Sequence, residues 1–180
     1  MKHDNEIARC IQRALESYFK DLDGEKPCAI YDMVMASVER PLIAFALERE
    51  KTLRDIEAAI NFARDYGKIG LVGYCWGGTM AYAAACSFAS LSAVSAYYGG
   101  GVTAMKEHEP KGPTIVHFGE RDAHIPMDGV RAFQSARQDV AVYVYAAEHG
   151  FNCDQRASFD EASAALARAR TLEHFAKYLG

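Results

Sequence analysis

Residues 69–105 contain no charged side chain, and a run of that length without charge belongs either in a membrane or in the interior of a folded domain. The run is interrupted by Gly73, by Gly77-Gly78 and by Gly99-Gly100-Gly101, and glycines at such intervals end regular elements instead of continuing a span. We therefore expect a buried strand, a buried helix and a second buried strand here, with no membrane as partner.

The spacing of apolar residues continues this alternation towards the C-terminus. It predicts strands at 68–74, 93–98, 114–118 and 140–145, and helices at 53–66, 76–88, 129–138 and 158–178. The first of these strands shows no polar alternation, as expected of a strand covered on both faces. Such a series implies a parallel sheet with right-handed crossovers, so the predicted fold class is α/β, a sheet flanked by helices.

The N-terminal part of the chain has a different pattern. Apolar side chains recur at helical spacing from Ile7 to Phe19 and again from Ile30 to Phe45, which predicts a helical hairpin whose second helix is kinked by Pro41. Two such helices are too short to bury their own apolar faces, so they need the rest of the chain or a second copy. We therefore divide the chain into a helical segment, residues 1–51, and an α/β domain, residues 52–180.

Charge and cysteine content argue against two kinds of site. A net charge of −4 and a pI of about 5.9 leave no basic field for a phosphate backbone, so we expect no nucleic acid as partner. The five cysteines are scattered and no pair has C-x-x-C spacing, which disfavours a disulfide framework and a metal site. This cysteine usage and the lack of an apolar signal sequence after Met1 favour the reducing cytoplasm as location.

The segment Gly73-Tyr74-Cys75-Trp76-Gly77 places a cysteine where a predicted strand meets a predicted helix. This spacing is typical of a nucleophile elbow, a turn so tight that flanking side chains would collide, which explains the glycines at both flanks. Free N–H groups at the start of the helix favour a thiolate, and the N–H of Trp76 is the expected oxyanion donor. The alternative is an inert, buried cysteine beside a tight turn.

A nucleophile at an elbow needs a base, and the base needs an acid that orients it. Asp122 follows the strand at 114–118 and His149 follows the strand at 140–145, so the chain order is nucleophile, acid, histidine. We predict that Cys75, Asp122 and His149 form a catalytic triad.

Three other residues compete for these roles. His117 lies within a strand, where we expect it to be buried, and His124 is too close in sequence to Asp122 to complete a triad with it. Glu120 is the rival acid, although a solvated loop charge is the simpler interpretation.

With these residues placed, three segments resemble the dienelactone hydrolase family. Residues 68–78 are similar to its nucleophile region, residues 118–126 to its acid loop and residues 148–151 to its histidine loop. The resemblance covers Leu53 to Leu179 and implies part of an α/β-hydrolase domain. It also implies cofactor-free hydrolysis of small esters or lactones such as dienelactone, with Cys75 as nucleophile.

The chain departs from that family in two respects. The family has a long segment before its nucleophile strand, which supplies further strands, a second oxyanion donor and an activating glutamate, and nothing in residues 1–51 resembles it. The family also carries a substrate-binding arginine where this chain has Cys153, and Arg156 is the expected substitute for holding a substrate carboxylate.

Residues 6–48 resemble a second family, the dimerisation half of the Fis DNA-binding proteins. The similarity lies in residues 15–25, 31–34 and 38–42, and it includes Pro41. It implies that two copies intertwine their helices into a homodimer, while the DNA-reading helix-turn-helix of that family does not follow here. The chain reads as a junction of two partial families.

Two functions of different kinds remain. The first is a thiol-dependent hydrolase of small esters or lactones, and the second is a dimeric interaction protein that carries an inactive hydrolase remnant. The discriminating feature is the sheet, because without preceding strands Lys68–Tyr74 becomes an exposed apolar edge, which is an association site. A DNA binder is disfavoured by the acidic charge.

Overall fold

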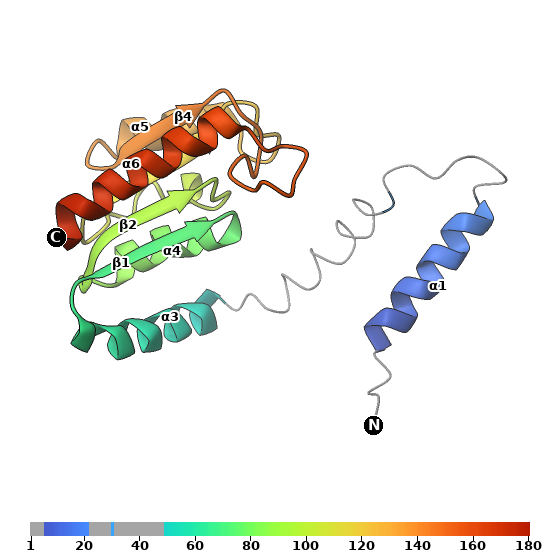
Figure 1. Ribbon diagram of the computed structural model, residues 1–180, viewed down its shortest axis with the longest axis horizontal. Coiled ribbons are helices and arrows are strands. Elements are labelled where there is room, and N and C mark those ends of the chain that lie inside the picture. Colours follow the sequence, from blue (N-terminus) through green and yellow to red (C-terminus); the bar gives the residue numbers. More distant parts are fainter. Residues whose placement is uncertain (1–5, 22–29, 31–48) are drawn as a thin grey trace. The chain divides into compact units, whose positions relative to one another are not determined.

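The computed structural model describes residues 6–21, 30 and 49–180, and the chain divides into two units at Glu48 and Arg49 (Figure 1). In the first unit, α1 spans Glu6–Asp21, and Phe19 on this helix is 51% exposed. The second helix expected over Pro27–Phe45 lies outside the described residues, apart from Ile30. In the second unit, α3 begins at Arg49 and therefore crosses the boundary expected at residues 51 and 52.

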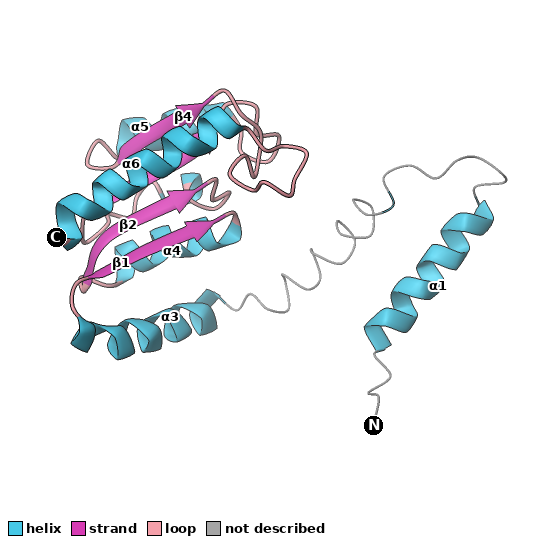
Figure 2. Ribbon diagram, in the orientation of Figure 1, coloured by secondary structure: helices cyan, strands magenta, loops and turns pink. Residues whose placement is uncertain are grey.

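The second unit contains a parallel sheet of four strands in the order β1-β2-β3-β4, drawn in magenta in Figure 2. The strands are β1 (Ile69–Tyr74), β2 (Leu91–Tyr97), β3 (Thr114–Gly119) and β4 (Ala141–Tyr145). The predicted α/β fold class is confirmed. Because all four strands run in one direction, the loops that leave their carboxyl ends gather at one edge of the sheet.

Helices cover both faces of this sheet. They are α3 (Arg49–Ala63), α4 (Trp76–Ser87), α5 (Met127–Ala136) and α6 (Glu161–Leu179), with short 3-10 turns η1 (Arg64–Tyr66) and η2 (Thr103–Met105). α4 packs on β1 and β2 and contacts α3, whereas α6 packs across β1, β2 and β3. In Figure 1, α6 passes in front of the strands and α4 lies behind β1.

The start of α6 illustrates how a local contact sets an element boundary. Helical spacing alone predicts a start at residue 158, but the helix begins at Glu161. The side chain of Asp160 accepts a hydrogen bond from the N–H of Ser163 at 2.8 Å, which is an N-cap contact. This contact sets the end of the preceding loop and stabilises the first turn of α6.

The core lies between the sheet and α4 and continues to α5. Tyr82, Phe118 and Phe133 are fully buried there, and the rings of Tyr82 and Phe133 meet edge to face at 5.3 Å. Each such side chain contributes about 1.5–3 kcal/mol by leaving water. This packing gives the sheet a rigid base for the loops at its carboxyl edge.

β1 lies at one end of the sheet and, among the described residues, pairs only with β2. Its side chains Val72 and Tyr74 are 40% and 43% exposed, so the expectation of a strand covered on both faces is wrong for β1, although β2 and β3 are buried almost throughout. The difference arises because β1 is an edge strand with a neighbour on one side only, which is the position expected for Lys68–Tyr74 when no strand precedes it.

Candidate active site

Cys75 occupies the turn between β1 and α4, as the elbow motif predicts. Its backbone has φ 54° and ψ −120°, a combination that non-glycine residues rarely adopt. The Cys75 N–H donates to the carbonyl of Tyr97 at 3.0 Å, and the Cys75 carbonyl accepts from the N–H of Thr79 at 3.2 Å. The surrounding backbone thus holds the unusual conformation on both sides.

The glycines of the elbow differ from the expectation in one respect. A Cβ on Gly73 would lie 2.0 Å from the Gly77 carbonyl oxygen, so only glycine fits at that flank. A Cβ on Gly77 would meet nothing within 4 Å, whereas one on Gly78 would lie 2.3 Å from the carbonyl of Tyr97. The second steric requirement is therefore at Gly78, because that is where α4 approaches the neighbouring strand β2.

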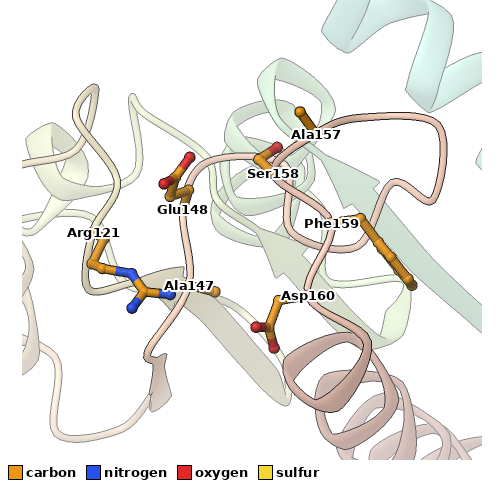
Figure 3. Close-up of a pocket in the computed structure, with 7 residues that line it drawn as sticks. All are labelled: Arg121, Ala147, Glu148, Ala157, Ser158, Phe159 and Asp160. Atoms are coloured by element: carbon orange, nitrogen blue, oxygen red, sulfur yellow. The ribbon is translucent and has the colours of Figure 1, made fainter.

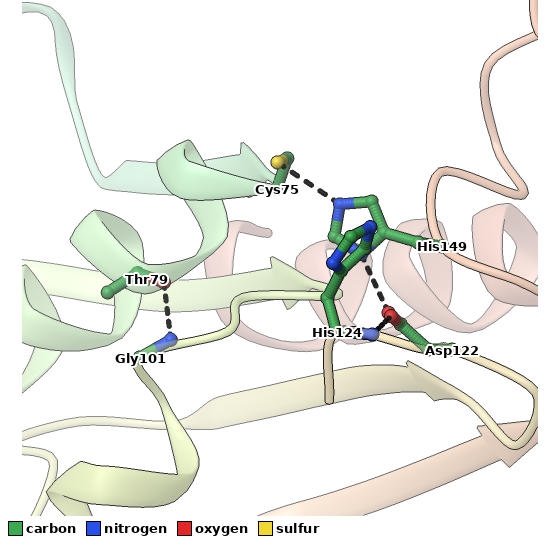
Figure 4. Close-up of polar contacts among 6 residues, drawn as sticks. All are labelled: Cys75, Thr79, Gly101, Asp122, His124 and His149. Carbon is green, nitrogen blue, oxygen red and sulfur yellow. Dashed lines mark hydrogen bonds and ion pairs between the residues drawn. The ribbon is translucent and has the colours of Figure 1, made fainter. Parts of the chain in front are cut away.

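The loops after β1, β3 and β4 bring three predicted residues into one chain of contacts (Figure 4). Nε2 of His149 lies 3.2 Å from Sγ of Cys75, and Nδ1 of the same ring lies 2.7 Å from Oδ2 of Asp122. The Asp122 side chain is fully buried, and its Oδ1 accepts the backbone N–H of His124 at 2.8 Å. Both carboxylate oxygens are therefore occupied, which fixes the orientation of the carboxylate.

These contacts shift the protonation equilibria of all three groups. The hydrogen bonds with Asp122 and Cys75 raise the pKa of His149 to about 9. The hydrogen bond with His149 lowers the pKa of Cys75 from 9.0 and outweighs burial, which acts in the opposite sense. Burial also raises the pKa of Asp122, but hydrogen bonds from His149 and the His124 N–H leave that pKa below its usual value. The pKa shifts of Cys75 and His149 both act in the direction of a thiolate beside an imidazolium, as in activated cysteines.

Two further residues lower the pKa of Cys75. The N–H of Trp76, in the first turn of α4, hydrogen-bonds to Cys75 and lowers its pKa. The positive charge of Arg156 acts in the same direction, and its guanidinium lies beside Gly150, where an added Cβ would be 3.4 Å from Arg156 Nη1. Both residues are therefore near the sulfur of Cys75.

The competing residues lie in other positions. His117 is buried in the sheet and contacts Ser95, Thr171 and Tyr145, while Glu120 is exposed. His124 does not contact both Cys75 and Asp122 with its side chain, but its ring meets the ring of His149 edge to face at 5.3 Å.

A residue that sequence patterns did not single out also borders His149. Tyr98, directly after β2, has φ 35° and its ring lies 5.2 Å from the ring of His149. The sequence alone does not predict the contact between Tyr98 and His149, because a tyrosine directly after a buried strand is ordinarily interpreted as a core residue.

A separate hollow lies between the loops after β3 and β4 and the approach to α6 (Figure 3). Its charged lining residues are Arg121, Glu148 and Asp160, and Arg121 donates to the carbonyl of Ala146 at 2.6 Å. Cys75 does not line it. Across the described parts of the chain, no group of three or more His, Cys, Asp or Glu side chains is placed to hold a metal ion.

The parallel sheet, the elbow and the loop residues at its carboxyl edge define the class of protein, an α/β-hydrolase. The model of the dienelactone hydrolase family matches residues 36–179, and the chain belongs to this family. The resemblance drawn from the sequence is thereby confirmed, but the match begins at residue 36, so the expectation that nothing in residues 1–51 resembles this family is wrong. The carboxymethylenebutenolidase of Pseudomonas putida is 34% identical over 141 residues, which cover 73% of this chain and 59% of that protein.

Solved structures agree with this assignment. A structure described as a dienelactone hydrolase from Klebsiella pneumoniae subsp. pneumoniae MGH 78578 matches with a TM-score of 0.65 and 27% identity, over 72% of this chain and 62% of that one. The dienelactone hydrolase-like promiscuous phosphotriesterase P91 from metagenomic libraries shares the fold, with a TM-score of 0.66 at 19% identity, over 81% of this chain and 69% of that one.

The second resemblance also has a counterpart. A Fis-like DNA-binding protein of Neisseria meningitidis serogroup A is 50% identical over 44 residues, which are 24% of this chain and 56% of that protein. The chain thus spans little more than half the length of the curated relatives named here. No helix within the described ranges is long and apolar enough to cross a membrane.

Proposed function

We propose that this protein is a thiol hydrolase of small esters or lactones, similar in reaction to a carboxymethylenebutenolidase. The observation that carries the proposal is the position of His149, whose two ring nitrogens contact Cys75 at 3.2 Å and Asp122 at 2.7 Å. A base within hydrogen-bond reach of a nucleophile, itself oriented by a carboxylate, is the arrangement that acyl transfer needs.

In the proposed reaction, the Cys75 thiolate attacks the carbonyl carbon of the substrate. The negative charge that develops on the carbonyl oxygen is stabilised by the N–H of Trp76. The tetrahedral intermediate collapses to a thioester, and the leaving oxygen takes a proton from the His149 imidazolium. His149, now neutral, removes a proton from water, and the resulting hydroxide attacks the thioester. The carboxylic acid leaves, and Cys75 and His149 return to the thiolate and imidazolium forms.

Arg156 supports a preference for substrates that carry a negative charge. Its guanidinium lies close enough to the sulfur to lower the pKa of Cys75, which puts a positive charge near the carbonyl group that the thiolate would attack. A planar guanidinium binds a carboxylate through two parallel hydrogen bonds. We therefore include Arg156 as a carboxylate-binding residue. The proposed reaction uses no cofactor, and the cysteine usage of the chain favours the cytoplasm as its location.

The direct test is hydrolysis of a chromogenic short-chain ester by the purified full chain. We expect turnover by the unaltered protein and a loss on the order of a thousandfold or more in the Cys75→Ser variant, since triad members act as a unit. Complete retention of activity in Cys75→Ala, which has no side-chain nucleophile, would remove the cysteine from the mechanism.

The same assay separates the two histidines. His149→Ala should abolish most of the activity, Asp122→Asn should reduce it somewhat less, and His124→Ala should retain most of it because only the His149 ring contacts both Cys75 and Asp122. The reverse ranking of the two histidine variants would transfer the base role to His124. A protein with no ester turnover in any form would instead support the interaction protein with a hydrolase remnant.

A further inference from the structure

Tyr98 combines a strained backbone with a buried side chain next to the proposed base. Its φ of 35° falls in the left-handed region, which is unfavourable for an aromatic residue. Three glycines, which adopt a positive φ easily, follow it directly, yet it is Tyr98 that has the positive φ. The residue is only 3% exposed. A strained backbone of this kind persists only where contacts with the surrounding residues hold it in place.

The surroundings of Tyr98 meet that requirement. Its N–H donates to the carbonyl of His117 at 2.7 Å, which ties the residue to β3. Further along the same loop, the N–H of Gly101 donates to Oγ1 of Thr79 at 3.0 Å, in the first turn of α4 (Figure 4). The loop is thus attached both to the neighbouring strand and to the helix that follows Cys75.

The ring of Tyr98 forms a platform for the histidine loop. It meets the ring of His149 at 5.2 Å and 60°, and the ring of Phe151 at 5.3 Å and 72°. Phe151 is fully buried, so the loop is anchored on the same ring that His149 contacts. Edge-to-face contacts of this geometry are attractive beyond the area that they bury.

A hydrogen bond to one ring nitrogen does not by itself fix an imidazole. The contact between His149 Nδ1 and Asp122 holds one point of the ring, about which the ring can still pivot. A pivot would carry Nε2 away from Sγ of Cys75, and with it the hydrogen bond that lowers the pKa of the thiol. Contacts on the ring itself restrict this freedom: the exposed ring of His124 meets the His149 ring at 5.3 Å, and the buried ring of Tyr98 meets it at 5.2 Å. Of these two neighbours, Tyr98 is the one that packing holds in place.

We infer that Tyr98 is a positioning residue, whose ring fixes the plane of His149 so that Nε2 faces the thiol of Cys75. The inference rests on the proposed role of His149 as the base. The ring performs this role, and the hydroxyl does not. Replacement of the ring should therefore change the state of Cys75, whereas removal of the hydroxyl should not.

The test is the pH dependence of iodoacetamide alkylation at Cys75 in the full chain, followed by mass spectrometry. Tyr98→Phe should give the unaltered midpoint. Tyr98→Leu and Tyr98→Met, which retain bulk but lose the ring, should move the midpoint upward by about one pH unit, with about tenfold less thiolate below the midpoint. The matched control is Phe133→Leu, which removes a fully buried ring that does not contact the site. It should lower the melting temperature and leave the midpoint in place.

An unshifted midpoint in folded Tyr98→Leu or Tyr98→Met would overturn the inference, as would an equal shift in Phe133→Leu. Loss of the folded state in both ring-removing variants, seen by near-ultraviolet circular dichroism, would make the ring a core residue and also overturn it. Alkylation needs no ester turnover, so absence of hydrolysis with the expected shifts would count against the proposed function alone.

Discussion

Cys75 and Cys86 carry the same thiol, but their surroundings shift its pKa in opposite directions. The hydrogen bond with His149 lowers the pKa of Cys75, whereas burial raises the pKa of Cys86. Cys75 stands at the N-terminus of α4, where the helix dipole favours a negative charge, and Cys86 lies near the other end of the same helix. The two ends of one helix therefore hold thiols whose pKa values are shifted in opposite directions.

This contrast predicts the order of labelling by iodoacetamide near neutral pH. Cys75 should react first and Cys86 slowly, because only the thiolate is the nucleophile. Mass-spectrometric mapping after brief treatment gives the order, and Cys86 is the internal control for access of the reagent. His149→Ala should slow the labelling of Cys75 and leave that of Cys86 unchanged. Preferential labelling of Cys10 or Cys153 would contradict the assignment of Cys75 as the reactive thiol.

At the scale of elements, a buried polar network joins α6 to the sheet. His117 on β3 contacts Ser95 on β2 and Thr171 on α6 through Nε2, each at 3.2 Å, and Tyr145 on β4 through Nδ1 at 2.8 Å. Arg170, also on α6, donates to the hydroxyl of Tyr145 at 3.1 Å. All four elements thus meet at one imidazole. A buried network of this kind makes the packing of a helix more rigid when each of its members has a hydrogen-bond partner.

Burial, followed by the charge of Arg170, lowers the pKa of His117 from 6.5 to about 3. The unfolded chain takes up a proton as the pH falls below 6.5, while the folded chain does not until about pH 3, so stability is lost across this range. The slope from one such group is about 1.4 kcal/mol per pH unit. Urea unfolding at several pH values measures it.

The variant for this measurement is His117→Gln, which should reduce the pH dependence of stability by up to one proton. The exposed histidine variant His108→Gln is the matched control. Equal slopes for the unaltered protein and His117→Gln would show that His117 does not remain neutral in the folded state.

At the scale of the whole molecule, we propose that the protein is a dimer held by its N-terminal helices. Phe19 on α1 is 51% exposed, and residues of this segment match a Fis-like DNA-binding protein at 50% identity over 44 residues. A helix with an apolar face and no core of its own is stabilised by a second copy. The rival is cover for the exposed edge of β1, where Val72 and Tyr74 remain open.

Deletion of residues 1–48 distinguishes these two roles. If the helices serve as a dimer interface, light scattering should give a dimer for the intact chain and a soluble monomer for residues 49–180. If the helices cover the β1 edge, the intact chain is a monomer and the shortened chain aggregates. An intact monomer at micromolar concentration would therefore end the dimer proposal.

Local patterns carried much of the fold and of the candidate site. The apolar run at 69–74, the glycine-flanked cysteine and the loops that follow residues 119 and 145 are each visible within a few residues. Because parallel strands end at one edge of a sheet, their chain order was enough to bring Cys75, Asp122 and His149 together as candidates. Periodicity also distinguished helices from strands, although caps such as Asp160 moved their ends.

Packing between distant residues decided the rest. Cys75 and His149 are 74 positions apart, and the distance between their side chains depends on strand order, register and loop conformation, which periodicity does not encode. The same dependence explains why sequence alone missed Tyr98 beside His149 and the steric need for glycine at Gly78. Each arises where two elements that are not neighbours in the local sequence pattern come into contact in the folded chain.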